Sequence, residues 1–170
     1  MAGPLLPRVN ARKLAASAVA VALLGAAGCG GAKHVATAKR VTGDGFSFEA
    51  PAGWEVTKAS RVVQARDGAA LLSVTTFRLA RPFRPALWET VVVPELDRVA
   101  GELAARVHGK LGRGRTRQIA GRNARTYDIA RNGAQERIAF VLDGRREYQL
   151  FCRGAGDACD RLLETFRLSA

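Results

Sequence analysis

Hydrophobic and polar positions alternate with a period of two in several stretches after residue 44, which is the pattern of a β-strand with one buried face. In "FSFEAPAGW" the alternation places Phe46 and Phe48 inward, and the turn residues 51–53 follow. Trp54 then begins the next strand and is expected in the core. The segments "RVVQAR" and "ALLSVTTFRL" predict two further strands, joined by a hairpin at Asp67-Gly68.

The period changes after Pro82 and Pro85. Apolar residues then recur at spacings of three and four, which predicts an amphipathic helix with the stripe Leu96, Val99, Ala100, Leu103 and Val107. Pro94 fits the first turn, where its missing N–H does no harm, and Gly109 ends the helix. A helix that began earlier, near Ala86, would be kinked at Pro94.

Alternating patterns return in the last third of the chain. The segments "RTRQIAG", "RNARTYDIAR", "AQERIAFVLD" and "REYQLFC" are separated by Gly121, Asn132-Gly133 and Asp143-Gly144, and the last two are strong hairpin signals. A closing helix, capped by Asp157, presents the apolar face Cys159, Leu162, Leu163 and Phe166. Together these elements predict an α+β fold, an antiparallel β-sheet covered by helices.

The first 28 residues have the pattern of a secretory signal, with a basic start, a short apolar run and small residues at its end. The run is shorter than the roughly 20 apolar residues of a transmembrane helix. Ala26-Ala27-Gly28-Cys29 resembles the lipobox of bacterial lipoproteins, although Ala26 stands where that family prefers leucine. The resemblance implies cleavage before Cys29, a lipid anchor on its sulfur, and a location on the extracytoplasmic face of the cell membrane.

The other two of the three cysteines are then free to pair. In an exported protein a disulfide between Cys152 and Cys159 would persist. A metal site or a redox site at these thiols is less favoured, because no histidine is near and no C-x-x-C occurs. The alternative for the leader is an ordinary cleaved signal, which would leave Cys29 as a free thiol.

Residues 29–44 are small, polar and partly basic, and are expected to be a flexible tether between the lipid and one domain over residues 45–170. The net charge of the whole chain is +12, which would suggest nucleic acid for a cytosolic protein. Export makes nucleic acid a poor partner and leaves anionic lipid, a wall polymer or an envelope protein. The arginine excess could equally be compositional.

A basic run offers a candidate binding surface. It comprises Lys110, Arg113, Arg115, Arg117, Arg122 and Arg125. If the two strands that carry most of these residues pair, their bases could form one cationic face that docks to an anionic surface. The alternative is a solvated loop without a function.

Signals for catalysis are weak. His34 lies in the tether and His108 ends the long helix, where a cation suits the helix dipole. The carboxylates Glu136, Asp143 and Glu147 each have an arginine within two positions, which is typical of surface ion pairs. We therefore expect no catalytic residues, no metal and no cofactor. Trp88 could contact a partner or a ligand on an exposed helix surface.

Three stretches together resemble one family. "GFSFEAPAGWEV", "REYQLFC" and "CDRLLETFRL" are similar to the PsbP/Mog-like domains, and more narrowly to small actinobacterial lipoproteins that carry this domain over about residues 45–168. The resemblance implies an α/β/α sandwich around an antiparallel sheet. It implies no single activity, because members are mostly accessory, scaffold or binding proteins.

The sequence thus predicts a lipid-anchored, non-catalytic accessory or binding module of the cell envelope. The alternative is a carrier of a small or lipidic ligand in an apolar pocket, and a hydrolase is less favoured. An apolar pocket of several hundred cubic ångströms would favour the carrier, and a filled core with a flat patch would favour the accessory module.

Overall fold

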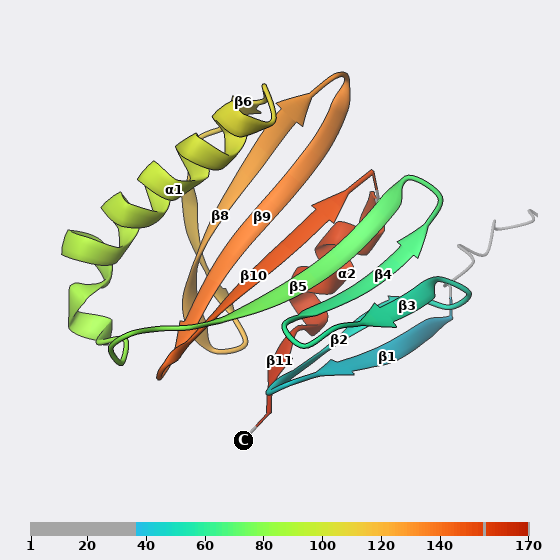
Figure 1. Ribbon diagram of the computed structural model, residues 1–170, viewed down its shortest axis with the longest axis horizontal. Helices are drawn as coiled ribbons and strands as arrows, with labels where there is room; N and C mark the ends of the chain where they lie inside the picture. Colours follow the sequence, from blue (N-terminus) through green and yellow to red (C-terminus); the bar gives the residue numbers. More distant parts are fainter. Residues whose placement is uncertain (1–36, 155, 170) are drawn as a thin grey trace, which may run out of the picture. The chain divides into compact units, whose positions relative to one another are not determined.

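The computed structural model describes residues 37–154 and 156–169 (Figure 1). The predicted signal sequence, Cys29 and His34 lie outside the described residues. The first half contains β1 (Ala38–Gly43), β2 (Phe46–Pro51), β3 (Glu55–Lys58), β4 (Val62–Asp67), β5 (Ala70–Arg78) and α1 (Val93–Arg106). The second half contains β6 (Lys110–Leu111), β7 (Arg115–Ile119), β8 (Arg122–Arg131), β9 (Ala134–Asp143), β10 (Arg146–Arg153), α2 (Asp157–Thr165) and β11 (Arg167–Leu168).

The strands form two antiparallel sheets. The larger sheet has eight strands in the order β3-β4-β5-β10-β9-β8-β6, with β7 also paired to β8. The smaller sheet has the order β1-β2-β11. The hairpins predicted at Asn132-Gly133 and at Gly144 join β8 to β9 and β9 to β10, as expected. Asn132 and Gly133 both have positive φ, 50° and 75°, which a tight two-residue hairpin turn requires.

Two hydrophobic clusters lie on opposite faces of the larger sheet, because neighbouring residues of a strand point to opposite faces. On one face Val141 and Leu150 pack with Leu162 of α2 and with aromatic residues of β2. On the other face Phe140 packs with Leu96 of α1. The α+β class is therefore confirmed, and the smaller sheet contributes to the first cluster together with α2.

The expected tether is too long at its carboxyl end. Residues 38–43 form β1, which pairs with β2 and buries Val41 to 3% exposure. The sequence did not reveal this strand because Val41 is its single buried large apolar residue among basic and small neighbours. The folded domain begins at least seven residues before the predicted boundary at residue 45.

Both helices differ in detail from the prediction. The helical segment begins at Pro85, widens into a π-type turn over Trp88–Val92, and continues as α1 with Pro94 in its first turn. The wider turn lies where an uninterrupted helix would bring a carbonyl against the proline ring. Asp157 is inside α2 and not its cap; Gly156 occupies that position and no side chain caps the helix.

Candidate functional site

The predicted basic cluster does not form one cationic face. Strands β7 and β8 do pair, with Arg115 opposite Thr126 and Arg117 opposite Ala124. Arg125 therefore points to the other face of the sheet, because it lies between those two β8 positions. Arg122 and Lys110 share the face of Arg115 and Arg117, and Arg113 lies in the loop between β6 and β7.

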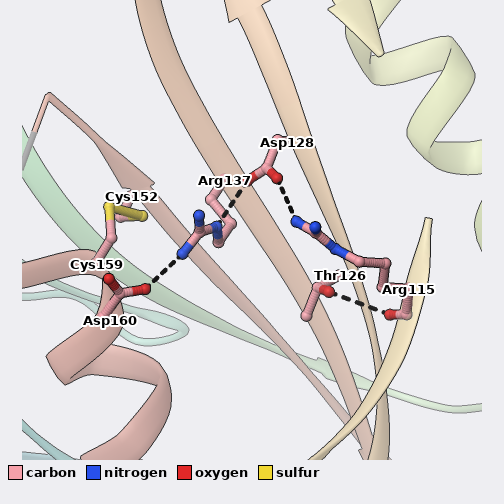
Figure 2. Close-up of polar contacts among 7 residues, drawn as sticks. All are labelled: Arg115, Thr126, Asp128, Arg137, Cys152, Cys159 and Asp160. Carbon is pink, nitrogen blue, oxygen red and sulfur yellow. Dashed lines mark hydrogen bonds and ion pairs between the residues drawn. A yellow bond between two sulfur atoms is a disulfide. The ribbon is translucent and has the colours of Figure 1, made fainter. Parts of the chain in front are cut away.

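Half of that cluster is also neutralised by carboxylates. Arg115 Nη2 lies 2.6 Å from Asp128, and Arg122 Nε lies 2.8 Å from Asp143. Figure 2 shows how the first pair continues across the sheet: Asp128 also accepts a hydrogen bond from Arg137, which reaches Asp160 of α2. The hydrogen bond that Arg137 donates to Asp128 is the main cause that raises the pKa of Arg137. This chain of alternating charges connects β7, β8, β9 and α2.

The third neutralised base holds α1 against the sheet. Arg125 donates two hydrogen bonds to Asp97 of α1, at 2.9 and 3.1 Å, and the buried Tyr127 hydroxyl donates a further one. Burial alone would raise the pKa of Asp97, but the hydrogen bonds from Arg125 and Tyr127 outweigh burial, and the pKa is lowered. Burial and Asp97 together raise the pKa of Tyr127 well above its usual value. Arg125 is thus a structural residue.

Trp88 is not the exposed partner contact that its position suggested. Its side chain is 2% exposed and lies in the α1 cluster, with Phe83 edge-on at 6.2 Å between ring centroids. Trp88 is the first residue of the π-type turn that precedes α1, and it is the buried residue of that turn. The neighbouring Leu87 and Val91 are exposed instead, at 41% and 54%.

The disulfide between Cys152 and Cys159 is confirmed. It joins β10 to the first turns of α2, with 5.6 Å between the two Cα atoms (Figure 2). Cys152 is 1% exposed, so the pair is part of the core and not a reactive surface thiol pair.

A second basic site lies at the end of the larger sheet where β4 and β10 begin and β5 ends. Its groove of about 640 Å³ is lined by Arg61, Arg78, Arg145 and Arg146, together with Asp44, Ser60, Thr76 and Phe77. We call this the arginine groove. Its residues come from the β1–β2 turn, the β3–β4 turn, the end of β5 and the β9–β10 turn (Figure 1). No local pattern of the sequence marks this groove, because its arginines come from separate turns and strand ends.

Backbone hydrogen bonds fix the walls of the arginine groove. The carbonyl of Arg61 accepts a bond from the Thr76 amide at 2.8 Å, so the β3–β4 turn is tied to β5. The carbonyl of Arg145 accepts a bond from the Leu79 amide at 2.9 Å. Arg145 also donates from its side chain to the Ala80 carbonyl at 2.8 Å. The arginines are thus presented by positions that the sheet holds in place.

The charges in the arginine groove are poorly balanced. Its lining holds four arginines and one carboxylate, Asp44, which lies 3.3 Å from Arg146 and is itself 74% exposed. Among residues 37–154 and 156–169, Arg61 and Arg78 make no ion pair. The nearby Tyr148 hydroxyl, and then the charge of Asp44, raise the pKa of Arg146. The groove can therefore bind an anion.

A small apolar pocket lies beside the carboxyl end of α1. Its volume is about 200 Å³, and its walls include Leu103, Ile138 and Phe151. Glu136, 4% exposed, lies there with Arg131 at 3.2 Å and Arg153 at 4.0 Å. Typical ligand sites measure about 300–1,000 Å³, so the pocket is smaller than an ordinary ligand site.

The three carboxylates weighed for catalysis do not converge. Glu136 and Asp143 are each paired with arginine, and Glu147 accepts a hydrogen bond from Gln149. No group of three or more His, Cys, Asp or Glu is placed to hold a metal ion within the described part of the chain. In that same part, no helix has the length and apolar character needed to cross a membrane.

Comparison with known structures shows the fold. The domain is similar to the solution structure of cyanobacterial PsbP (CyanoP) from Synechocystis sp. PCC 6803, with a TM-score of 0.58 and 16% identity over 83% of this chain and 97% of that chain. A crystal structure from Bacteroides thetaiotaomicron has a TM-score of 0.49 and 9% identity over 74% of this chain and 46% of that chain. No protein-family model and no curated protein matches the sequence. The domain has a PsbP-like fold.

Proposed function

We propose that the chain is an exported lipoprotein of the actinobacterial type, held on the extracytoplasmic face of the cell membrane by lipid on Cys29. Its PsbP-like α/β/α domain acts as a non-catalytic accessory module that binds an anionic component of the cell envelope. The observation that carries the binding role is the arginine groove, where four arginines line one hollow with a single carboxylate. The buried disulfide supports export, because such bonds persist in oxidising compartments.

The carrier function is less well supported. The apolar pocket beside α1 has a volume of about 200 Å³, whereas a carrier of lipidic molecules needs a larger apolar cavity. The larger hollow is the arginine groove, whose lining is polar and charged apart from Phe77. Native mass spectrometry of protein purified from its own membrane should show no retained lipid beyond the covalent anchor.

The lipid anchor is tested by the intact mass of the protein from its source organism. We expect loss of residues 1–28 and addition of a diacylglyceryl group at Cys29. The Cys29→Ala variant should not carry the lipid and should leave the membrane fraction. A wild-type protein that keeps its leader would contradict the proposal.

The binding role is tested by sedimentation of the full-length chain with envelope fragments of the source organism. We expect Arg61→Gln together with Arg78→Gln to lower the bound fraction at least several-fold. The matched control changes Arg113 and Arg117 to Gln, which removes the same charge from two exposed bases that make no ion pair in the described part of the chain. An equal loss of bound protein in both variants would show that binding depends on net charge alone and would overturn the proposal.

A further inference from the structure

Two like charges lie side by side in the arginine groove. Arg78 of β5 is directly opposite Arg146 of β10 in the antiparallel register. Directly opposed side chains of a strand pair are close, and like charges at such positions destabilise a sheet. Asp44 compensates Arg146 in part, and Arg78 makes no ion pair in the described residues. A bound anion would relieve this repulsion.

The groove also contains a buried hydroxyl that lacks a partner. Among the residues described, Thr76 Oγ1 is inaccessible to solvent and makes no hydrogen bond. Thr76 lines the arginine groove and an adjoining hollow of about 290 Å³, and both hollows also share Ser60 and Arg61. A buried hydroxyl without a partner is costly and uncommon in a folded protein. Rotation of the half-buried Thr76 side chain about its Cα–Cβ bond would turn this hydroxyl toward the groove, where it would donate to an oxygen of a ligand.

These donors suit a phosphate better than a carboxylate. Guanidinium groups bind phosphate oxygens in a two-pronged geometry. The arginines approach from three separate segments: the β3–β4 turn, the end of β5 and the β9–β10 turn. A carboxylate presents two oxygens in one plane with its carbon, whereas even a phosphodiester has two charged and two ester oxygens arranged tetrahedrally around phosphorus, so donors can approach it from several sides.

The basic surface is longer than a single phosphate requires. Arg81 and Arg84 are exposed on the segment that follows β5. This segment is tied to the β9–β10 turn by the bond from the Phe83 amide to the Gly144 carbonyl, at 2.7 Å. A volume of about 640 Å³ is within the range of sites for extended small molecules, roughly 300–1,000 Å³. The basic surface is therefore long enough to contact more than one phosphate of an extended ligand.

The lining offers little for nucleobases. Phe77, 38% exposed, is the one aromatic residue in the described lining of the groove. Sites for single-stranded nucleic acid usually provide several aromatic side chains on which successive bases stack. A polymer with phosphates but without bases fits this surface better.

We propose that the arginine groove binds a phosphodiester-linked polymer of the envelope, with one phosphate between Arg61, Arg78 and Thr76 and the next phosphates toward Arg81 and Arg84. This inference rests on the proposed function, because it names the ligand class of the same site. The polymer, and not the headgroup of the anchoring membrane, is the source of the phosphates.

The test uses full-length lipidated protein in nanodiscs of neutral phosphatidylcholine. The probe is fluorescent poly(glycerol phosphate) of about ten repeats, followed by anisotropy, with polyglutamate of equal charge as the comparison. We expect the phosphate polymer to bind at least tenfold more tightly. Arg61→Gln with Arg78→Gln should weaken binding at least tenfold and reduce the salt dependence by a slope of about 0.7 for each lost contact. The Arg113→Gln, Arg117→Gln control should change binding less than twofold.

Thr76→Val separates ligand binding from folding. The valine removes a hydroxyl that has no partner in the described structure, so the melting temperature should stay equal or rise. The affinity for poly(glycerol phosphate) should nevertheless fall several-fold. A variant that binds as well as the wild type would remove Thr76 from the site and overturn this part of the proposal.

The remaining outcomes separate the inference from the proposed function. Equal binding of polyglutamate and poly(glycerol phosphate) at the groove would overturn the phosphate inference and leave the anion-binding function intact. Competition by phosphatidylglycerol in the nanodisc, at the same groove, would identify the lipid headgroup as the source and overturn the polymer. Absence of binding to any of these anions, or equal loss in the control variant, would overturn both.

Discussion

The disulfide offers a prediction whose size follows from the structure. Cys159→Ala removes the covalent connection between β10 and the first turns of α2, and leaves Cys152 as a buried thiol. A free buried cysteine behaves as a small hydrophobic side chain, and alanine is the best helix former. The variant therefore measures mainly the loss of the crosslink.

The expected loss can be worked from the length of the closed loop. The two cysteines are seven positions apart, so the loop contains eight residues. The chain-entropy relation for a loop of this length gives about 2.5 kcal/mol of stability at 25 °C. For a domain of this size, we expect the melting temperature to fall by roughly 10 °C.

Urea unfolding, followed by circular dichroism, measures this loss. Wild-type protein reduced with dithiothreitol should unfold at the midpoint of Cys159→Ala, and the reductant should have no effect on the variant. Asp160→Asn is the control for the neighbouring ion pair with Arg137. Asp160 is 61% exposed, so its loss should cost at most about 1 kcal/mol. A Cys159→Ala variant within about 0.5 kcal/mol of oxidised wild type, well below the loop-closure value, would refute the reasoning.

Three further predictions concern the hydrophobic clusters on the two faces of the larger sheet. Asp97→Asn should lower stability by about 1–3 kcal/mol at neutral pH, because the hydrogen bonds from Arg125 and Tyr127 lose a charged acceptor. Because the folded pKa of Asp97 lies below its ordinary 3.8, the wild-type advantage should be complete above that pH and decline as the pH falls further, in urea titrations across pH 2–7. Trp88→Ala should cost about 3–5 kcal/mol, because the ring is buried, while envelope binding of the folded fraction stays unchanged in the sedimentation assay. Gly43→Ala should cost about 1–3 kcal/mol in thermal melts, because the new Cβ would lie 2.1 Å from the buried ring of Phe46; an unchanged melting temperature would contradict this packing.

Local patterns predicted most of the elements because each depends on neighbours in the sequence. Alternation identified the long strands, as in Phe46 and Phe48, and the Asn132-Gly133 pair identified its hairpin. The cysteine pair was also predictable, since the strand and the helix that carry it are adjacent in the chain. In contrast, β1 and β11 escaped prediction, because six and two residues with few apolar positions become strands through their pairing with β2.

The distribution of charge likewise divides into what the local sequence predicts and what strand pairing decides. The sequence places Arg113, Arg115, Arg117, Arg122 and Arg125 together, and the structure gives Arg115, Arg122 and Arg125 carboxylate partners from β8, β9 and α1. The arginine groove is the reverse case, because Arg61, Arg78 and Arg146 are far apart in the sequence and are brought together by strand ends. Strand pairing acts over long separations that no local pattern records.

The sequence by itself determined the α+β class, the long strands, the two helices and the cysteine pair, because periodicity and turn chemistry act over a few residues. The tertiary structure decided which face each base occupies, that Trp88 is buried, and where uncompensated positive charge collects. Burial and charge balance depend on what the rest of the chain places beside a residue, and strand order sets those neighbours.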